Sequence, residues 1–278
     1  QVHITDIINN GSPTFSFEFF PPKSERASES LFETIKDLES LAPSYVSITY
    51  GAGGTTRERT HDLVEKILEK TTLIPIPHLT CVQHTEEEIS NILKRYSDKG
   101  ISNILALRGD NPKGDAQYDR SKDSFCFARD LVEFIRNFDN STFDKKSNSF
   151  GIGVAGFPEG HPETPNRIKE MDYLKAKVDS GADYICTQLF FDNHDFFDFR
   201  DRCELAGINI PIIAGIMPVT SISGMQRMAD LAAGSRFPAK LLKSIDRCNS
   251  DSDAVERVGI QYATEQCSDL LNNGVDGI

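Results

Sequence analysis

The sequence has no pair of cysteines at the C-x-x-C spacing that zinc and redox sites use. Its six cysteines are scattered through 278 residues, which indicates reduced thiols in a cytoplasmic protein and not a disulfide framework. No two histidines stand at the helical spacing of metal ligands, so the sequence predicts no metal site. It also shows no secretory signal and no apolar stretch of membrane-spanning length, and both absences favour a cytoplasmic location.

Positive charge is scarce as well. Lysine and arginine number 30 against 42 aspartates and glutamates, which gives a formal net charge of -12. This balance argues against nucleic acid or an anionic membrane as a partner, because both require a basic surface. An anionic small molecule remains possible, since it needs only a local basic pocket. Hydrophobic residues make up 38% of the chain, enough for a globular core, and the length suits one α/β barrel or two small domains.

Short apolar runs rich in β-branched residues recur roughly every thirty residues, the length of one strand–helix unit. Amphipathic segments with apolar residues at helical intervals lie between them. The predicted strands are Thr14–Phe20, Tyr45–Tyr50, Ile74–Cys81, Asn103–Arg108, Gly151–Phe157, Asp183–Phe191 and Pro211–Met217. The predicted helices are Leu31–Leu41, Thr60–Glu69, Thr85–Tyr96, Asp123–Asn137, Ile168–Ser180, Asp195–Ala206 and Val255–Leu271.

Strict alternation of strands and helices predicts a parallel sheet, either open and doubly wound or closed into a barrel. We favour an α/β fold of the (β/α)8 TIM-barrel type, in a single domain over residues 1–278. An eighth strand is due after the helix Val255–Leu271, where the chain reaches Gly274–Ile278. We therefore expect the eighth strand and the last helix to be truncated. The polar stretch 139–149 is predicted to be a surface insertion.

Glu18 is a single carboxylate within the apolar run Thr14–Phe20, which ends at Pro21 and Pro22. A carboxylate near the end of a buried strand is costly to ionise, so we expect its pKa to rise towards neutrality. A raised pKa suits a carboxylic acid that donates a proton at neutral pH. The alternative is an edge strand with Glu18 facing water, and the strand by itself does not separate the two.

Polar residues stand at or just beyond the carboxyl ends of the predicted strands, where barrel active sites are assembled. They are Glu18, Thr49, His78, the group Arg108-Gly109-Asp110, His161 and Gln188. Taken singly, these signals are weak: His78 could be a structural histidine, His161 could shape a turn, and Arg108 could pair with Asp110. Gln188 is the exception, because an amide within an apolar run must be hydrogen-bonded or carry a desolvation cost.

Two glycine-rich stretches resemble phosphate-binding motifs. Gly151–Gly156 matches the pattern G-x-G-x-x-G letter for letter, but that pattern must follow a strand and open a helix. Here it lies within a predicted strand and runs into Pro158, so it predicts no dinucleotide site. Gly51–Gly54 lacks the third glycine and is interpreted as a tight turn that could admit a ligand closely.

Several multi-residue stretches, in order and at family-like spacing, resemble the catalytic barrel of the methylenetetrahydrofolate reductase family over essentially the whole chain. They are Ser16–Lys23, Val46–Ala52, Pro77–Cys81, Ala106–Asp110, Pro158–Glu163, Lys177–Ala182 and Thr187–Asp192.

The resemblance implies a cytoplasmic flavoenzyme of one-carbon metabolism and methionine biosynthesis, which we expect to be a homo-oligomer. In such an enzyme FAD is reduced by NADH or NADPH and then passes a hydride to 5,10-methylenetetrahydrofolate, the two substrates taking turns. Glu18 matches the general acid that helps open the folate ring, and Asp110 a carboxylate near the flavin N1 and the pterin. The implied substrate-binding residues are Thr49, Asp110, Gln188 and Met228. The implied FAD-contacting residues are Thr49, His78, Leu107, Arg108, Gly109, Asp110, Phe127, Ala128, Phe157, His161, Glu170 and Lys177.

Two positions depart from the family pattern. Met228 stands where some members stack a phenylalanine on the substrate, and Glu170 stands where an aspartate often contacts FAD. A second hypothesis is a catalytically inactive flavin- or folate-binding barrel with a regulatory role. The presence of Glu18, Asp110 and Gln188 together counts against it. A pterin-binding methyltransferase barrel is a third, but its chemistry would require a Cys/His cluster that this sequence lacks.

Overall fold

The computed structural model describes residues 2–22, 24–51, 54–112, 117–138, 149–232 and 235–278. Its seven strands lie in one sheet in chain order, with parallel pairing from β1 through β5 and between β6 and β7. The strands are β1 (Ser16–Phe19), β2 (Tyr45–Ile48), β3 (Pro75–Thr80), β4 (Asn103–Leu107), β5 (Gly151–Gly156), β6 (Tyr184–Thr187) and β7 (Ile212–Ile213).

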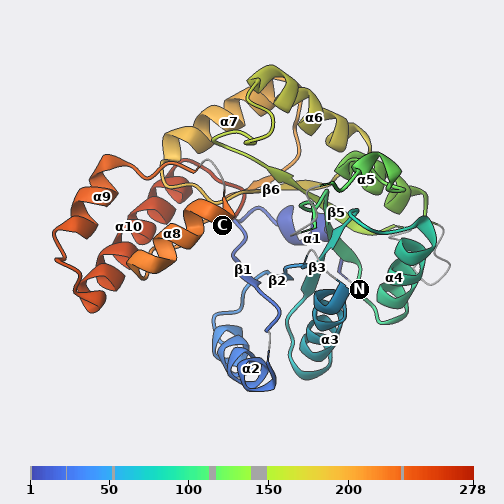
Figure 1. The fold of residues 1–278 in the computed structure, drawn as a ribbon, viewed down its shortest axis with the longest axis horizontal. Coiled ribbons are helices and arrows are strands. Elements are labelled where there is room, and N and C mark those ends of the chain that lie inside the picture. Colours follow the sequence, from blue (N-terminus) through green and yellow to red (C-terminus); the bar gives the residue numbers. More distant parts are fainter. Residues whose placement is uncertain (1, 23, 52–53, 113–116, 139–148, 233–234) are drawn as a thin grey trace. The chain divides into compact units, whose positions relative to one another are not determined.

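Helices alternate with these strands along the chain, as Figure 1 shows. They are α1 (Ile4–Ile8), α2 (Glu25–Glu39), α3 (Gly54–Lys70), α4 (Glu86–Asp98), the 3-10 helix η1 (Arg120–Lys122), α5 (Ala128–Asn137), α6 (Arg167–Asp179), α7 (Asn193–Leu205), α8 (Ile222–Leu231), α9 (Ala239–Asp246) and α10 (Ser252–Asn272). A parallel sheet in chain order with helical crossovers is the arrangement of the (β/α)8 barrel, so the predicted fold class is confirmed.

An eighth strand begins at the end of the chain, as expected. Gly277 forms a parallel bridge with Ile213, and its carbonyl accepts a hydrogen bond from the backbone N–H of Ala214 at 2.9 Å. The Asp276 carboxylate supports the same contact by accepting the N–H of Ile212 at 2.8 Å. A single parallel bridge thus follows α10 along the chain.

The chain divides into two compact units. The first comprises residues 1–154 and 177–184, and the second comprises residues 155–176 and 185–278. In the first unit, every residue of β3 is buried, as expected for a parallel strand covered on both faces. Helices α3 and α4 are joined by Arg95, which lies 3.1 Å from Glu58 and 2.8 Å from Glu65.

The short helix α1 closes the amino end of β4 and β5. The fully buried Asn103, at the start of β4, accepts the N–H of Ile4 at 2.7 Å and donates to the carbonyl of Val2 at 2.8 Å. A side chain at Gly151 would meet Ile4 Cγ2 at 2.6 Å and Asn103 Oδ1 at 2.4 Å. Glycine at the start of β5 therefore allows α1 to lie close to the strand.

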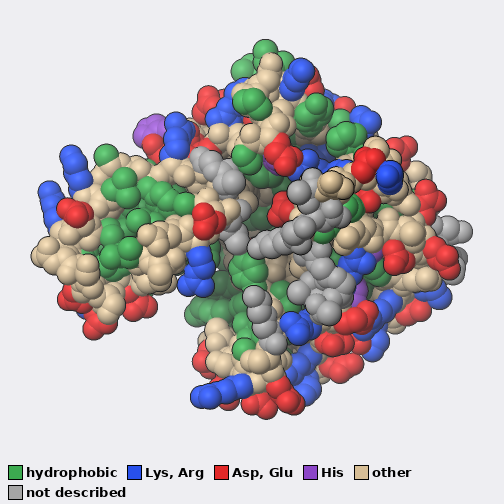
Figure 2. Space-filling model, viewed as in Figure 1, with side chains coloured by type: hydrophobic (Ala, Val, Ile, Leu, Met, Phe, Trp, Pro, Cys, Tyr) green, Lys and Arg blue, Asp and Glu red, His purple; other side chains and the backbone are tan. Residues whose placement is uncertain are grey.

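The second unit has its own apolar core among α8, α9 and α10. Its buried members include Leu189, Phe191, Met228, Leu241 and Val255. Figure 2, drawn in the same view as Figure 1, shows apolar side chains continuing to the surface over these helices. The exposed ones are Ile222, Leu242, Ile260 and Leu271.

The structure also differs from the sequence-based expectations. Helices α1, α8 and α9 were not predicted, and β7 covers Ile212–Ile213 where Pro211–Met217 was expected. The strand ends early because the N–H of Gly215 donates to the Thr187 side chain, at 2.9 Å, instead of continuing the ladder. Gly151–Gly156 forms β5, so its interpretation as a strand is confirmed. The predicted insertion 139–149 lies, apart from Ser149, outside the described residues, as do Ala52 and Gly53 of the predicted turn.

Candidate functional site

The polar centre of the first unit is Glu18, which lies beside Ser47 and His78. Glu18 in β1 pairs directly with Ser47 in β2, and Ser47 pairs with Ile76 in β3. His78 stands two residues beyond Ile76, so its side chain is on the same face of the sheet. The Ser47 hydroxyl donates to Glu18 Oε2 at 3.3 Å, and His78 Nε2 lies 3.3 Å from the same oxygen.

These neighbours set the acidity of Glu18. Burial raises the pKa of the Glu18 carboxyl. The hydrogen bond and charge of His78, together with the hydrogen bond from the Ser47 hydroxyl, lower the pKa by a larger amount. The net pKa lies below the ordinary value, so the expectation of a raised pKa is wrong. The Glu18 side chain also remains 45% exposed, because β1 is an edge strand among the described residues. The alternative prediction, an edge strand with Glu18 facing water, therefore agrees with the exposure of this side chain. His78 and Ser47 nevertheless both contact the carboxylate.

Thr49 continues the same face of β2, two residues beyond Ser47. Its N–H donates to the carbonyl of Phe19 at 2.9 Å, and its carbonyl accepts the hydroxyl of Thr60 in α3 at 3.0 Å. Thr49 is thus held by β1 on one side and by α3 on the other.

The Arg108-Gly109-Asp110 group forms a turn after β4 that Arg120 of η1 holds in place. The Arg120 guanidinium donates to the carbonyl of Gly109 at 3.0 Å and to Asn111 Oδ1 at 2.7 Å. Gly109 has φ +77, and a Cβ there would lie 2.7 Å from Val82 Cγ1, so only glycine fits. Asp110 is exposed beyond this turn. The half-buried Leu107 is the last residue of β4.

The amino end of α5 carries two of the predicted cofactor contacts. Phe127 is 52% exposed, and its N–H is capped by Asp130 Oδ2 at 2.9 Å, while Ala128 is the first residue of the helix. Lys177, near the carboxyl end of α6, is half-buried. These positions supply an exposed aromatic ring and a cation within the first unit.

In the second unit, the loop after β5 is held by arginines from three segments. Arg202 of α7 donates to the carbonyl of Pro158 at 3.2 Å, and Arg236 contacts Glu159 at 3.1 Å. Gly160 has φ +97 and lies under the guanidinium of Arg167. The loop thereby brings two predicted residues, Phe157 and His161, together with ring centroids 4.7 Å apart.

Glu170 of α6 lies in the same unit and is buried, with 7% of its surface exposed. Neither carboxylate oxygen has a hydrogen-bond partner among the described residues, and Arg167 Nη1 lies 3.5 Å away. Burial raises the pKa of Glu170, and the charges of Arg167 and Arg202 oppose that rise. The Glu170 carboxylate thus has an ion-pair partner in Arg167 and retains lone pairs that can accept further hydrogen bonds.

Gln188 follows the last residue of β6 and is half-buried. Its backbone N–H donates to the carbonyl of Gly156 at 2.8 Å, which places it beside the end of β5. Its side-chain Oε1 accepts the N–H of Leu189 at 3.0 Å. The amide oxygen thus accepts one hydrogen bond, and the Nε2 group offers two donors to a ligand. Met228, in contrast, is 4% exposed within the apolar core of this unit, which is a packing position.

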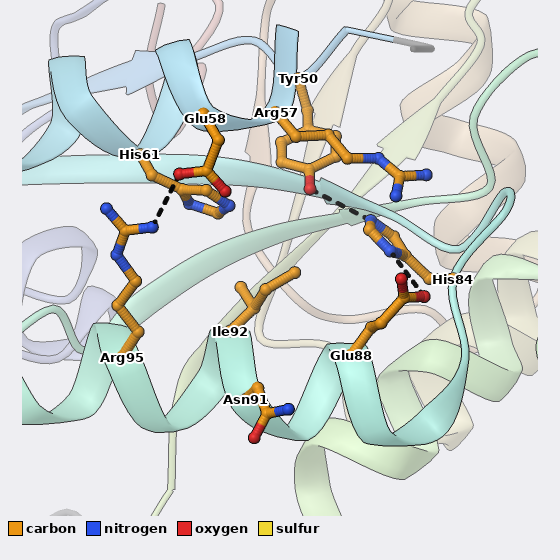
Figure 3. A pocket seen from close by; sticks show the side chains of 9 residues that line it. All are labelled: Tyr50, Arg57, Glu58, His61, His84, Glu88, Asn91, Ile92 and Arg95. Atoms are coloured by element: carbon orange, nitrogen blue, oxygen red, sulfur yellow. Dashed lines mark hydrogen bonds and ion pairs between the residues drawn. The ribbon is translucent and has the colours of Figure 1, made fainter. Parts of the chain in front are cut away.

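A pocket of about 290 Å³ lies between α3 and α4 of the first unit, outside the predicted site residues (Figure 3). The Tyr50 hydroxyl and His84 Nε2 are 3.1 Å apart, and His84 Nδ1 lies 3.6 Å from Glu88. Burial lowers the pKa of His84 to about 4 and raises that of Tyr50. Because Tyr50 follows Thr49 directly, this network fixes the chain where β2 ends. The remaining lining residues are Arg57, Glu58, His61, Asn91, Ile92 and Arg95.

Sequence reasoning did not identify Ser47, Arg120, Arg202 or Arg236, which hold the predicted residues in position. Their partners are distant in sequence, so no local pattern marked them. Within the described residues, no helix is long and apolar enough to cross a membrane. No cluster of three metal-binding side chains occurs in the same part of the chain.

The comparisons of sequence agree on one family. The family profile for methylenetetrahydrofolate reductase matches residues 3–278. A methylenetetrahydrofolate reductase (NADH) of Arabidopsis thaliana is 38% identical over 284 residues, covering 99% of this chain and 47% of its own length. The 5,10-methylenetetrahydrofolate reductase of Escherichia coli is 37% identical over 265 residues, covering 95% of this chain and 84% of its own. The chain thus spans about half the length of the plant relative.

A solved structure supports the fold. It is a protein from Clostridium thermocellum described as binding two copies of 5-methyl-5,6,7,8-tetrahydrofolic acid. It superimposes with a TM-score of 0.67 at 15% identity, covering 99% of this chain and 90% of its own.

Proposed function

Because the chain belongs to the methylenetetrahydrofolate reductase family, we propose that it reduces 5,10-methylenetetrahydrofolate to 5-methyltetrahydrofolate. In this proposal FAD is the cofactor, and NADH or NADPH and the folate react in turn. The name of the plant relative makes NADH the first donor to test.

The observation that carries the proposal is the contact of Glu18 with Ser47 and His78. Opening the folate ring requires a proton on the departing nitrogen, and Glu18 is the proposed donor. Because the pKa of Glu18 is lowered, this site does not match a simple model in which burial alone keeps the carboxyl protonated. Glu18 is instead proposed to deliver its proton from a carboxyl that lies 3.3 Å from His78 Nε2 and accepts the Ser47 hydroxyl.

The described residues include side chains with the chemistry that FAD requires. In the first unit Arg108 and Lys177 are cations suited to a pyrophosphate, Phe127 is an exposed aromatic ring, and Thr49 and His78 are polar. In the second unit the carboxylate of Glu170, which is paired with Arg167, can also accept the hydroxyl groups of a sugar-like chain. When bound, FAD supplies hydride transfer between the nicotinamide and the folate. The further proposed contacts are Leu107, Gly109, Asp110, Ala128, Phe157 and His161.

Substrate binding is proposed for Asp110, Gln188 and Thr49. Asp110 is exposed beyond a turn that Arg120 fixes, so its charge can stabilise a cationic folate intermediate. Gln188 offers N–H donors, because its oxygen is engaged with Leu189. For Met228 the core position supports a role in shaping the unit, and direct contact with the substrate stays a prediction.

We also propose a homo-oligomer, supported by the exposed apolar residues Ile222, Leu242 and Ile260. Light scattering of the purified protein tests the homo-oligomer, and a single monomer mass would refute it.

The six cysteines are all free, which supports a reducing, cytoplasmic location.

An absorbance experiment tests the function. We expect purified protein to show oxidised flavin bands, to lose them anaerobically with NADH or NADPH, and to regain them when methylenetetrahydrofolate is added. Absence of flavin binding would refute the proposal. Flavin that is bound but never reoxidised by the folate would favour the inactive, regulatory alternative.

A further inference from the structure

The segment that follows β6 is fixed by side chains that bind its backbone carbonyls. The carbonyl of Leu189 accepts the Ser235 hydroxyl at 3.2 Å, and that of Phe190 accepts Gln266 Nε2 at 3.0 Å. The carbonyl of Phe191 accepts the Tyr262 hydroxyl at 2.6 Å. Three consecutive carbonyls beyond the end of the strand thus have side-chain donors in place of ladder partners.

Two of these donors come from one face of α10. Tyr262 and Gln266 are four residues apart and therefore neighbours on the helix surface. Gln266 is 6% exposed, and its backbone carbonyl accepts Asn193 Nδ2 at 3.0 Å, which ties the start of α7 to the same place. A shift of the segment along α10 would leave buried polar groups unpaired, so this contact allows one register.

The register matters because Gln188 lies directly before these carbonyls. Its Oε1 accepts the N–H of Leu189, the residue whose carbonyl Ser235 binds. The orientation of the Gln188 amide therefore depends on where the backbone of Leu189 is held. With the oxygen engaged, the Nε2 donors are left for a ligand.

We propose that Gln266 and Tyr262, assisted by Ser235, are positioning residues for Gln188. They hold residues 189–191 so that the Gln188 amide presents donors, and this selects a ligand with a hydrogen-bond acceptor such as a carbonyl oxygen or a ring nitrogen. The ligand part of this inference rests on the proposed function. The positioning part rests on the contacts alone.

The first test is independent of activity and uses hydrogen exchange. Gln266→Leu removes the donor to Phe190 with little change in volume, and Gln261→Leu is the matched control. Gln261 lies on the same helix, is exposed, and bonds only Glu265 among the described contacts. We expect faster amide exchange at Leu189 and its neighbours in Gln266→Leu and none in the control, with a smaller increase in Tyr262→Phe. Unchanged exchange at Leu189 in Gln266→Leu would overturn the positioning role.

The second test is kinetic. In Gln266→Leu we expect KM for methylenetetrahydrofolate to rise about 2- to 10-fold, the worth of one hydrogen bond, with FAD content and Tm matching the control. The decisive comparison is the same substitution in a Gln188→Ala background. If Gln266 acts through Gln188, its effect on KM disappears there. An equal effect in both backgrounds, or a loss of Tm and FAD in proportion to activity, would show a merely structural role. If the parent protein never reduces the folate, the proposed function fails, and the exchange result still decides the positioning.

Discussion

His78 Nε2 lies 3.3 Å from Glu18 Oε2, between side chains that come from β3 and β1. This contact opposes the effect of burial on the pKa of Glu18, and the pKa is lowered. Variants of the proposed proton donor, Glu18, should separate proton transfer from flavin binding.

Glu18→Gln should leave FAD bound and its reduction by the nicotinamide nearly intact, because only the folate half-reaction requires a proton. Loss of general acid catalysis should slow folate reduction by roughly 10²–10⁴-fold. Stopped-flow traces of the two half-reactions measure both effects. Glu29→Gln, at an exposed position of α2, is the control. Equal slowing of the two half-reactions would remove Glu18 from the acid role.

Asp110→Asn should raise the flavin reduction potential, because a negative charge near the flavin disfavours its reduced, anionic form. Folate turnover should fall more than flavin reduction. Arg120 contacts Gly109 and Asn111 and not Asp110, so the turn should keep its shape. A spectroelectrochemical titration provides the potential, with Asp37→Asn as an exposed control. An unchanged or lowered potential argues against a place near the flavin.

Gln188→Glu should weaken folate binding and slow folate reduction, with a smaller effect on the nicotinamide step. The new carboxylate can still accept the N–H of Leu189, but it loses the donors and adds a charge. Both half-reactions and Tm should be measured, with Gln226→Glu as an exposed control. If Gln188 were only a core amide, a buried unpaired carboxylate would cost several kcal/mol, and all activities would fall together.

Acid should destabilise the protein through His84. Its folded pKa of about 4 lies below the ordinary value of 6.5, so the unfolded state binds the proton more tightly between these values. The contribution of neutral His84 is complete above pH 6.5 and is lost as the pH falls towards 4, with a slope of at most about 1.4 kcal/mol per pH unit.

Denaturant unfolding at several pH values, comparing the parent protein with His84→Gln, measures this slope. It should become shallower in the variant between pH 4 and 6.5. His194 is a contrasting control: its Asp192 hydrogen bond raises its pKa, so its stabilisation is present below 6.5 and lost above it. His194→Gln should therefore remove the loss of stability above pH 6.5. An unchanged slope in His84→Gln would contradict the assignment.

Local patterns predicted the elements that carry their own signal. The alternation of apolar strands and amphipathic helices was sufficient to predict a parallel sheet, and Pro158 after Gly156 was sufficient to reject a nucleotide loop. Helix α1 could not be predicted, because its five residues have no period and it depends on Asn103.

The sequence predicted the positions of the candidate site residues better than it predicted their surroundings. The predicted strand ends located Glu18, His78 and Gln188 correctly, because all three lie near the carboxyl ends of strands in the structure. The pKa of Glu18 was wrong because it depends on His78, a partner from another strand. Tyr262 and Gln266 gave no signal, since a polar residue on a helix ordinarily faces water.

The contact between Asn103 and Ile4 has a consequence for the order of folding. It joins residues 99 positions apart, so its loop-closure entropy must be overcome before the bond forms. Strands β1 to β4, which pair with neighbours nearer in sequence, can assemble first and create the buried position of Asn103. The amino-terminal helix should therefore dock late in the folding of the first unit, and its attachment reports that β4 is already in place.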